Sequence, residues 1–359
     1  MLLFTTLALV SSIVSAAESV PYADDSDLTG DRVGYLGATP EQTLRVERLF
    51  RRPLDEAKVL EIQVTLETSK FGSLGVPSLK FTRSQAELTT DQNGIATTQC
   101  DKAADKQVFV AELKAPGYEV RGEQGIYRLE LEAECGTRTI AQVRPETDPG
   151  QALTIFRILS RAREKLSQTV DLRFWNETIP VEWPASGDFY SWGSVHITRG
   201  DYWDVVGHEL GHAIYHLARV GSSAGGAHRI DECYSGALAI SEGWASYFSA
   251  WVSLESNDGD AKFEYMVPRR APIQIETIPS DVCDGPTNEW RVSSFFWDLI
   301  DLSNDGEGSD ATFRSIWDAL LRSGSSDVSS AYLRLKSHGV DSALLAIVWD
   351  LNFRTQRPN

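Results

Sequence analysis

Residues 201–212 read DYWDVVGHELGH, and the expected fold of the C-terminal half follows from this stretch. His208 and His212 are four residues apart, so on a helix they lie on one face and can direct ring nitrogens at one ion. Asp201 can cap the start of that helix, with Asp204 three residues later in the capping-box position. Zinc accepts two such nitrogens at about 2.0–2.1 Å. The stretch therefore predicts a helix that supplies two zinc ligands.

Glu209 directly follows the first histidine, so we expect it to lie beside the ion without coordinating it. There its carboxylate can take a proton from a water molecule that attacks a carbonyl carbon. The HExxH pattern is short enough to arise by chance, and in an arbitrary helix these would be surface or core histidines. Zinc is favoured by an export signal, by the small Gly211 between the histidines and by a fitting third ligand.

The third protein ligand decides the class of metal site. Metzincins have glycine at the position of Tyr215 and histidine at the position of Ala218, so that class is excluded. His216 is one turn further along the same helix, roughly 12 Å from His208 by helical rise, too far to share the ion. The ligand therefore has to come from another segment.

Residues 235–254, SGALAISEGWASYFSAWVSL, form a second helical pattern that is largely apolar. Glu242 is its one charged residue, and an unpaired carboxylate buried in such a helix would be costly. Coordination of zinc removes that cost, whereas the alternatives are exposure to solvent or a pair with an arginine. We expect Glu242 to be the third ligand of one zinc ion.

Two short stretches resemble a known group of enzymes. HELGH at 208–212 and SEGWASYF at 241–248 are similar to the HExxH and EGW elements of the gluzincins, the thermolysin- and fungalysin-like secreted metallopeptidases. The resemblance implies a zincin-like catalytic domain that hydrolyses peptide bonds in proteins or peptides. It implies zinc ligands His208, His212 and Glu242, with Glu209 as the catalytic base.

The chain departs from that group in two places. More residues separate His212 from Glu242 than in thermolysin, and the Gly-rich stretch 221–226 between them is expected to form a loop. Many relatives carry aspartate four residues after the ligand glutamate, where it orients a zinc histidine, but this chain has Ser246. The partner of that histidine is then a weaker donor–acceptor or another residue.

Two further parts of such a site stay open. Gluzincins bind substrate along an antiparallel edge strand, and residues 194–198 are either that strand or an ordinary strand of a small sheet. A Tyr, His or Arg facing the developing oxyanion is also expected. The candidates are Arg291, which is slightly favoured, Tyr265, Tyr234, His228 and His338.

Residues 55–145 have the period-two alternation of strands, as in Ile62, Val64 and Leu66, which predicts a small β-sandwich. The stretches 89–100 and 108–120 resemble carboxypeptidase regulatory-like (transthyretin-like) domains, which implies a fold rather than an activity. What this domain binds is left open.

Residues 146–359 become mainly helical, beginning with apolar residues at helical spacing between Ile155 and Leu166. The expected fold class is α+β. An N-terminal β-sandwich is followed by a mainly helical zincin-like catalytic domain with a small antiparallel sheet.

The N-terminus has the pattern of a leader. Residues 1–17 combine an uncharged apolar run with small residues at its end, as in a signal peptide. Residues 18–54 read as a propeptide or linker, with an amphipathic helical stretch at 41–50 and with its removal undecided. We expect a secreted protein whose mature form has no integral membrane segment.

The four cysteines are consistent with an oxidising compartment. Three pairings are possible, and the one that keeps the two halves separate is Cys100–Cys135 with Cys233–Cys283.

A partial calcium pattern begins at Asp301. Asp301, Ser303, Asp305 and Gly306 match the start of a calcium loop, but Thr312 stands where a bidentate glutamate belongs. A solvated acidic turn is the favoured interpretation, with calcium as the less favoured one.

Charge limits the partners. A net charge of −17 repels phosphate groups, which argues against nucleic acid and anionic membranes. The competing hypothesis is a catalytically idle zinc-binding adhesion or interaction protein, against which the intact Glu209 argues. The sequence discloses neither the cleavage specificity nor the oligomeric state.

Overall fold

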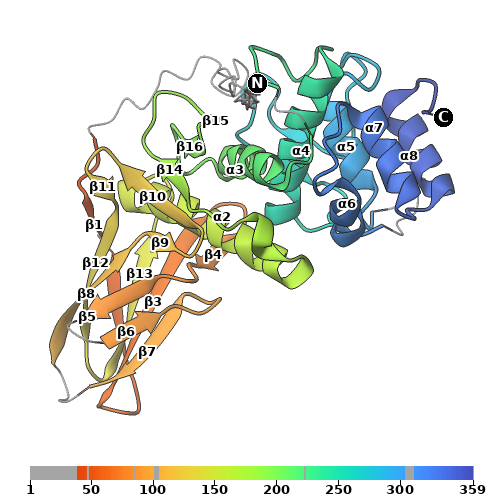
Figure 1. Ribbon diagram of the computed structural model, residues 1–359. Helices are drawn as coiled ribbons and strands as arrows, with labels where there is room; N and C mark the ends of the chain where they lie inside the picture. Colours follow the sequence, from red (N-terminus) through yellow and green to blue (C-terminus); the bar gives the residue numbers. More distant parts are fainter. Residues whose placement is uncertain are drawn as a thin grey trace, which may run out of the picture.

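The computed structural model describes residues 39–46, 48–83, 86–100, 105–221, 224–303 and 311–358. The signal peptide expected over 1–17 lies outside these residues. Strands dominate the first part of the chain and helices the second, and the two parts lie side by side (Figure 1). The expected α+β class is confirmed.

Two sheets form the N-terminal sandwich, in the strand orders β1-β12-β8-β5-β6 and β2-β13-β3-β4, with β7 also paired to β3. Buried and exposed residues alternate along β3 and β12, because successive side chains of a strand point to opposite faces. The buried faces share one core. The strands are β1 (Thr43–Arg45), β2 (Leu49–Pro53), β3 (Val59–Thr68), β4 (Gly72–Gly75), β5 (Lys80–Arg83), β6 (Ala86–Thr89), β7 (Ile95–Gln99), β8 (Lys106–Glu112), β12 (Arg128–Glu134) and β13 (Thr137–Val143).

The helix expected over 41–50 is wrong, because this stretch contributes to β1 and β2. β1 runs parallel to β12, and β2 runs antiparallel to β13. Arg51 of β2 also pairs with Glu132 of β12 at 3.0 Å. Pairing with strands about 80 residues away therefore overrides the local helical pattern.

A third sheet joins the two parts of the chain, in the order β11-β10-β14-β16-β15 with β9 on β10. It is mixed rather than antiparallel as expected, because β10–β14 and β14–β16 are parallel pairs. Its members are β9 (Lys114–Ala115), β10 (Tyr118–Gly122), β11 (Gly125–Ile126), β14 (Ile179–Glu182), β15 (Phe189–Ser191) and β16 (Ser194–His196). Strands from before and after residue 146 thus share hydrogen bonds.

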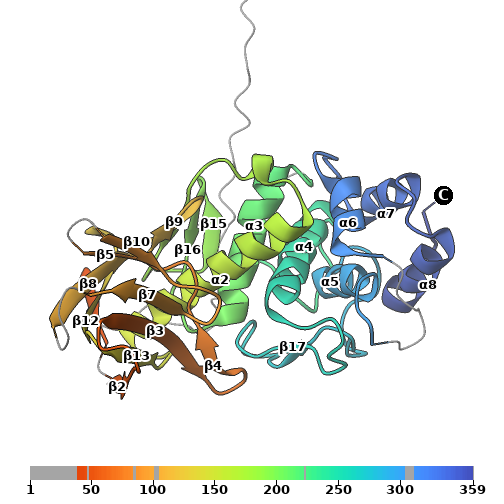
Figure 2. The same cartoon turned by 90° about the horizontal axis from the view of Figure 1, so that it is seen from below.

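Helices are the main regular structure of the second part, as expected. α2, α3 and α4 pack against one another beside the sandwich, and α5 to α8 lie on the far side of α4 (Figure 2). They are α2 (Asp148–Thr169), η1 (Leu172–Phe174), α3 (Trp203–Ala218), α4 (Gly236–Ser253), α5 (Glu289–Asp298), α6 (Phe313–Leu320), α7 (Val328–Ser337) and α8 (Ser342–Phe353), with a hairpin of β17 (Lys262–Phe263) and β18 (Ile273–Gln274). None of the described helices combines the length and apolarity needed to cross a membrane.

All four cysteines form disulfides, in the expected pairing. Cys100–Cys135 closes the sandwich between the end of β7 and the turn after β12. Cys233–Cys283 joins the segment before α4 to the segment before α5. Each bond lies within one part of the chain.

The two central helices approach closely at Gly211. A Cβ atom on Gly211 would lie 2.7 Å from Cα and 2.8 Å from the carbonyl oxygen of Ala245, both main-chain atoms of α4. A glycine here lets the backbones of α3 and α4 meet.

We expect Gly211→Ala to lower the free energy of unfolding by about 1–3 kcal/mol, the usual cost of overpacking, despite the better helix propensity of alanine. Urea denaturation followed by circular dichroism measures it. Gly207→Ala is the matched control, because its Cβ would first meet the side chain of Ser249 rather than main chain. Equal costs for the two variants would contradict the interpretation.

Candidate metal centre

Helices α3 and α4 bring His208, His212 and Glu242 together. Their ligand atoms all lie within 4.8 Å of one another. Glu242 Oε2 is 3.2 Å from His208 Nε2 and 3.0 Å from His212 Nε2, and the two histidine nitrogens are 3.0 Å apart. All three side chains are at most 3% exposed. Three donors of two types converging on one buried point form a group that can hold a metal ion.

Asp201 does not cap the N-terminus of α3, in contrast to the prediction. Its N-cap is Tyr202, without a side-chain cap, and Asp201 instead accepts two hydrogen bonds from Arg199. Asp204 is fully buried and accepts the backbone N–H groups of residues 264–266 at 2.7–3.2 Å. Burial raises the pKa of Asp204, and these hydrogen bonds oppose the rise. Asp204 therefore anchors a distant loop to α3.

Glu209 is buried next to the ligands on α3, with 1% of its surface exposed. It follows His208 directly and is not one of the three clustered donors. The role of this carboxylate as catalytic base stays a prediction.

Ser246 is the outer partner of one histidine. Its Oγ lies 3.1 Å from Nδ1 of His208. When Nδ1–H donates to that hydroxyl, the lone pair of Nε2 is free to face the ion. The serine thus holds the ring of His208 in this orientation.

His228 lies at the same centre, 2% exposed, on the loop before α4. Its Nδ1 donates to the carbonyl of Gly226 at 2.8 Å. Its Nε2 is 3.9 Å from Glu242 Oε2 and 3.2 Å from Glu289 Oε2. Of the five candidates for the oxyanion contact, His228 is the one whose side chain reaches a ligand carboxylate within the described residues.

The pKa of Glu242 reflects this surrounding. Burial alone would raise it, but the charges of His212 and His228 and hydrogen bonds from both α3 histidines hold it well below its ordinary value. The carboxylate is therefore ionised, as a metal ligand has to be.

Arg291, the slightly favoured candidate for the oxyanion contact, instead holds neighbouring segments together. Its guanidinium donates to the carbonyls of Val282, Cys283 and Asn352 at 2.7–3.1 Å. It also pairs with Asp284 at 2.6 Å. None of these partners belongs to the ligand group, so the contacts of Arg291 do not support the preference for it.

The other candidates have different contacts. Tyr234 is 37% exposed and donates to Glu232. Tyr265 stacks on Tyr202 with ring centroids 4.6 Å apart. His338 is the exposed C-cap of α7. The ring of Tyr234 also meets the ring of His228 edge-on, with centroids 6.3 Å apart, so Tyr234 is linked to the centre through His228.

Residues 194–196 form a strand, but not the edge strand. β16 lies between β14 and β15, so β15 is the edge, and both β15 and β16 pack against α3. The turn between them places Trp192 in the solvent, 77% exposed. Of the two interpretations of 194–198, the structure shows the ordinary strand of a small sheet, and β15 is the edge strand.

A second group of acidic side chains lies at the other end of α5. Glu276, Asp298 and Asp301 each place a carboxylate oxygen within 4.8 Å of the others. Asp301 accepts the backbone N–H of Ser303 at 3.0 Å, as in an acidic turn. The rest of the expected calcium loop, 304–310, falls outside the described residues.

A large cavity lies away from the ligand group. It has a volume of about 1000 Å³ and separates the β3–β4 hairpin from α2 and the N-terminus of α3. Phe71 and Trp203 are among its lining residues, whereas the clustered donors are not. The candidate metal centre is therefore not part of this cavity.

The sequence matches no protein-family model and no curated protein. The chemistry of the site therefore rests on its own geometry.

Proposed function

We propose that the chain is a secreted zinc-dependent endopeptidase of the gluzincin type, with Glu209 as the general base. The observation that carries the proposal is the buried convergence of His208, His212 and Glu242 from two packed helices. Two imidazoles and one carboxylate are a donor set that suits zinc, and three protein ligands are typical of catalytic sites. The two disulfides support an extracellular location.

Each residue has a part in the reaction. A zinc ion bound there would polarise the scissile carbonyl and lower the pKa of a water molecule. Glu209 accepts the proton of the attacking water and returns it to the amine that leaves. His228 is placed to face the negative charge that develops on the carbonyl oxygen. An extended peptide can pair with the free edge of β15.

Two alternatives are less well supported. A structural zinc site closes with four protein ligands, but the described residues supply three converging donors. An idle binding protein has no need of a buried carboxylate directly beside the first ligand, where Glu209 lies. The donor set and this carboxylate together favour hydrolysis.

The direct test is hydrolysis of casein and of a mixed peptide library by the purified protein. We expect cleavage within peptide chains, its loss on treatment with 1,10-phenanthroline, and its recovery when zinc is added back. Mass spectrometry of the products gives the cleavage preference. A zinc-loaded protein that cleaves nothing in the library would favour the binding role.

Ser246→Ala is expected to weaken zinc binding by about 10–100-fold, because the ring of His208 loses its outer partner. Competition with a chromogenic chelator measures the affinity. Ser249→Ala is the matched control on the same helix, since its hydroxyl donates to the carbonyl of Asp204 and not to a ligand. An unchanged affinity in Ser246→Ala would remove the serine from the site.

A further inference from the structure

The loop that carries His228 is tied to the start of α5. Asn288, the N-cap of α5, is fully buried and accepts the N–H of Arg291 with its side-chain oxygen. Its side-chain nitrogen donates to the carbonyls of Ile230 and Glu232, both at 2.8 Å. One side chain thus begins the helix and holds the loop.

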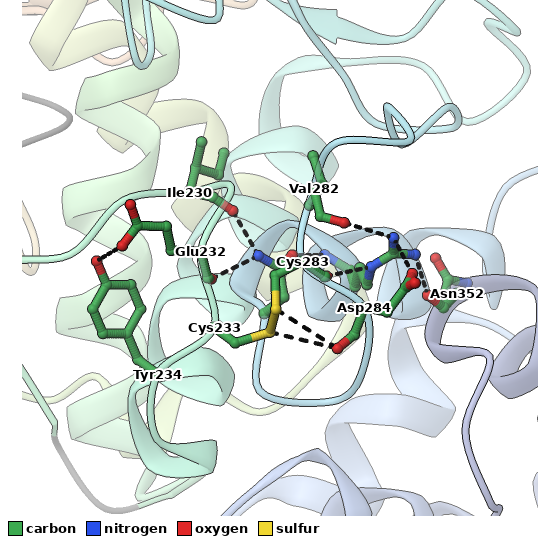
Figure 3. The surroundings of a disulfide bond; sticks show 10 residues. Ile230, Glu232, Cys233, Tyr234, Val282, Cys283, Asp284 and Asn352 are labelled. Atoms are coloured by element: carbon green, nitrogen blue, oxygen red, sulfur yellow. Dashed lines mark hydrogen bonds and ion pairs between the residues drawn. A yellow bond between two sulfur atoms is a disulfide. The ribbon is translucent and has the colours of Figure 1, made fainter.

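Two more contacts fix the same loop. The Cys233–Cys283 disulfide links it to the segment before α5 (Figure 3). Asp231 accepts hydrogen bonds from Arg269 at 2.8 Å and from Arg270 at 3.0 Å. Hydrogen bonds from Arg269, and next from Arg270, lower the pKa of Asp231 against the effect of burial. The loop is therefore held in one position relative to α5.

Glu289 is the first residue of α5, so the same contacts fix its position relative to the loop. Its side chain reaches His228, with Oε2 at 3.2 Å from Nε2. On the opposite side of the ring, Nδ1 is bonded to Gly226 at 2.8 Å. Contacts at both nitrogens leave the imidazole one orientation, with Nε2 3.9 Å from the ligand oxygen of Glu242.

The charges explain why such an arrangement is unusual. Glu289 and Glu242 are 9% and 3% exposed, and two carboxylates buried near one another repel. The imidazole of His228 lies between them and contacts both. A core built only for stability would place an apolar residue at 289, because pairs of buried charges are seldom the more stable choice.

We propose that Glu289 is a positioning residue, which holds His228 in the orientation needed at the metal centre. This inference rests on the proposed function. His228 contacts the reacting group, and Glu289 acts only through His228. The hydrogen bonds of Asn288 and the disulfide hold the loop that carries His228 in a fixed position relative to Glu289.

A double-mutant cycle tests the proposal. Glu289→Ala is expected to lower kcat/KM for a peptide by about 10–100-fold, mainly in kcat, as outer residues of metal sites do. His228→Ala is expected to lower kcat by about 10²–10³-fold. The double variant should be no worse than His228→Ala, because the two residues act as one unit. Independent, multiplied losses would overturn the proposal, as would wild-type activity in Glu289→Ala.

Glu289→Gln keeps the shape of the side chain and an oxygen that can face the ring, and it should restore much of the activity lost in Glu289→Ala. If the alanine variant does not fold, the glutamine variant replaces it in the cycle. Glu255→Gln is the matched acid-to-amide control, because its exposed side chain pairs with Arg161 and not with His228. It should retain wild-type kcat.

The ring signals of His228 give a readout that needs no substrate. The chain has 6 histidines, so long-range ¹H–¹⁵N spectra of the zinc-loaded protein can be assigned. Glu289→Ala should shift the His228 ring nitrogens and leave those of the exposed His338 unchanged. If wild type cleaves no peptide, the proposed function fails, but a shift confined to His228 still supports the positioning contact. An unchanged His228 signal would overturn it.

Discussion

Glu209→Gln is expected to lower kcat for peptide hydrolysis by about 10²–10⁴-fold, the range that general base catalysis contributes. The amide cannot accept the proton of the attacking water, although it has the shape of the carboxylate. KM should change little, because Glu209 is not among the clustered donors and removing it leaves the ligands in place. Steady-state kinetics on a fluorogenic peptide give both constants.

Zinc content and folding are the controls for this variant. One zinc per chain is expected in both proteins, measured by mass spectrometry of the metal. The melting temperature should not fall, because the change removes a charge from a site that is 1% exposed. Full activity in Glu209→Gln would remove the residue from the mechanism. A loss of zinc would show that it acts as a ligand.

His212→Ala is expected to lose zinc and all detectable peptide hydrolysis, and to melt earlier than the zinc-loaded wild type. A ligand present at a thousand times its Kd stabilises the folded state by about 4.1 kcal/mol. For a unit of 150–250 residues this corresponds to about 8–16 °C in Tm. Differential scanning calorimetry with and without a chelator measures the wild-type difference, which the variant should lack.

His216→Ala is the matched control, since His216 lies one turn beyond His212 on α3 but is exposed to solvent. Its ring contacts Tyr190 of β15, with centroids 5.8 Å apart, and lies outside the donor group. This variant should keep its zinc and its chelator-dependent shift in Tm. Equal zinc loss in both variants would contradict the assignment of the ligands.

The parts of the site that could be predicted depend on short-range geometry. Two histidines four residues apart share a helix face wherever that helix lies, and a lone carboxylate in an apolar helix needs a partner. Gly211 likewise follows from the close approach of two helices. These relations hold within one or two helices, so the sequence alone can predict them.

The features that escaped prediction depend on contacts between distant segments. Asp204 looked like part of a capping box, but its carboxylate binds backbone groups about 60 residues later. Residues 41–50 have a helical pattern, yet β12 and β13 offer this stretch edges to pair with. Neither partner is visible in the local sequence.

Glu289 was missed for a similar reason. Its signal was present, because Asn288 followed by an acidic residue is typical of the start of a helix. Nothing in that pattern indicates that the side chain of Glu289 turns toward a loop 60 residues earlier. The sequence favours Arg291 instead, because its hydrogen bonds to carbonyl groups cannot be recognised from the sequence either.

The sheet in which β10 pairs with β14 has a consequence for how the protein can be produced. If the chain is cut near residue 146, the downstream fragment keeps β14 but loses the strand that covers its edge. An uncovered strand edge recruits other chains, so the isolated fragment is expected to aggregate. During synthesis the N-terminal strands are made first, and β10 then offers the edge with which β14 of the second half pairs. The β-rich half therefore belongs in any expression fragment meant to be active.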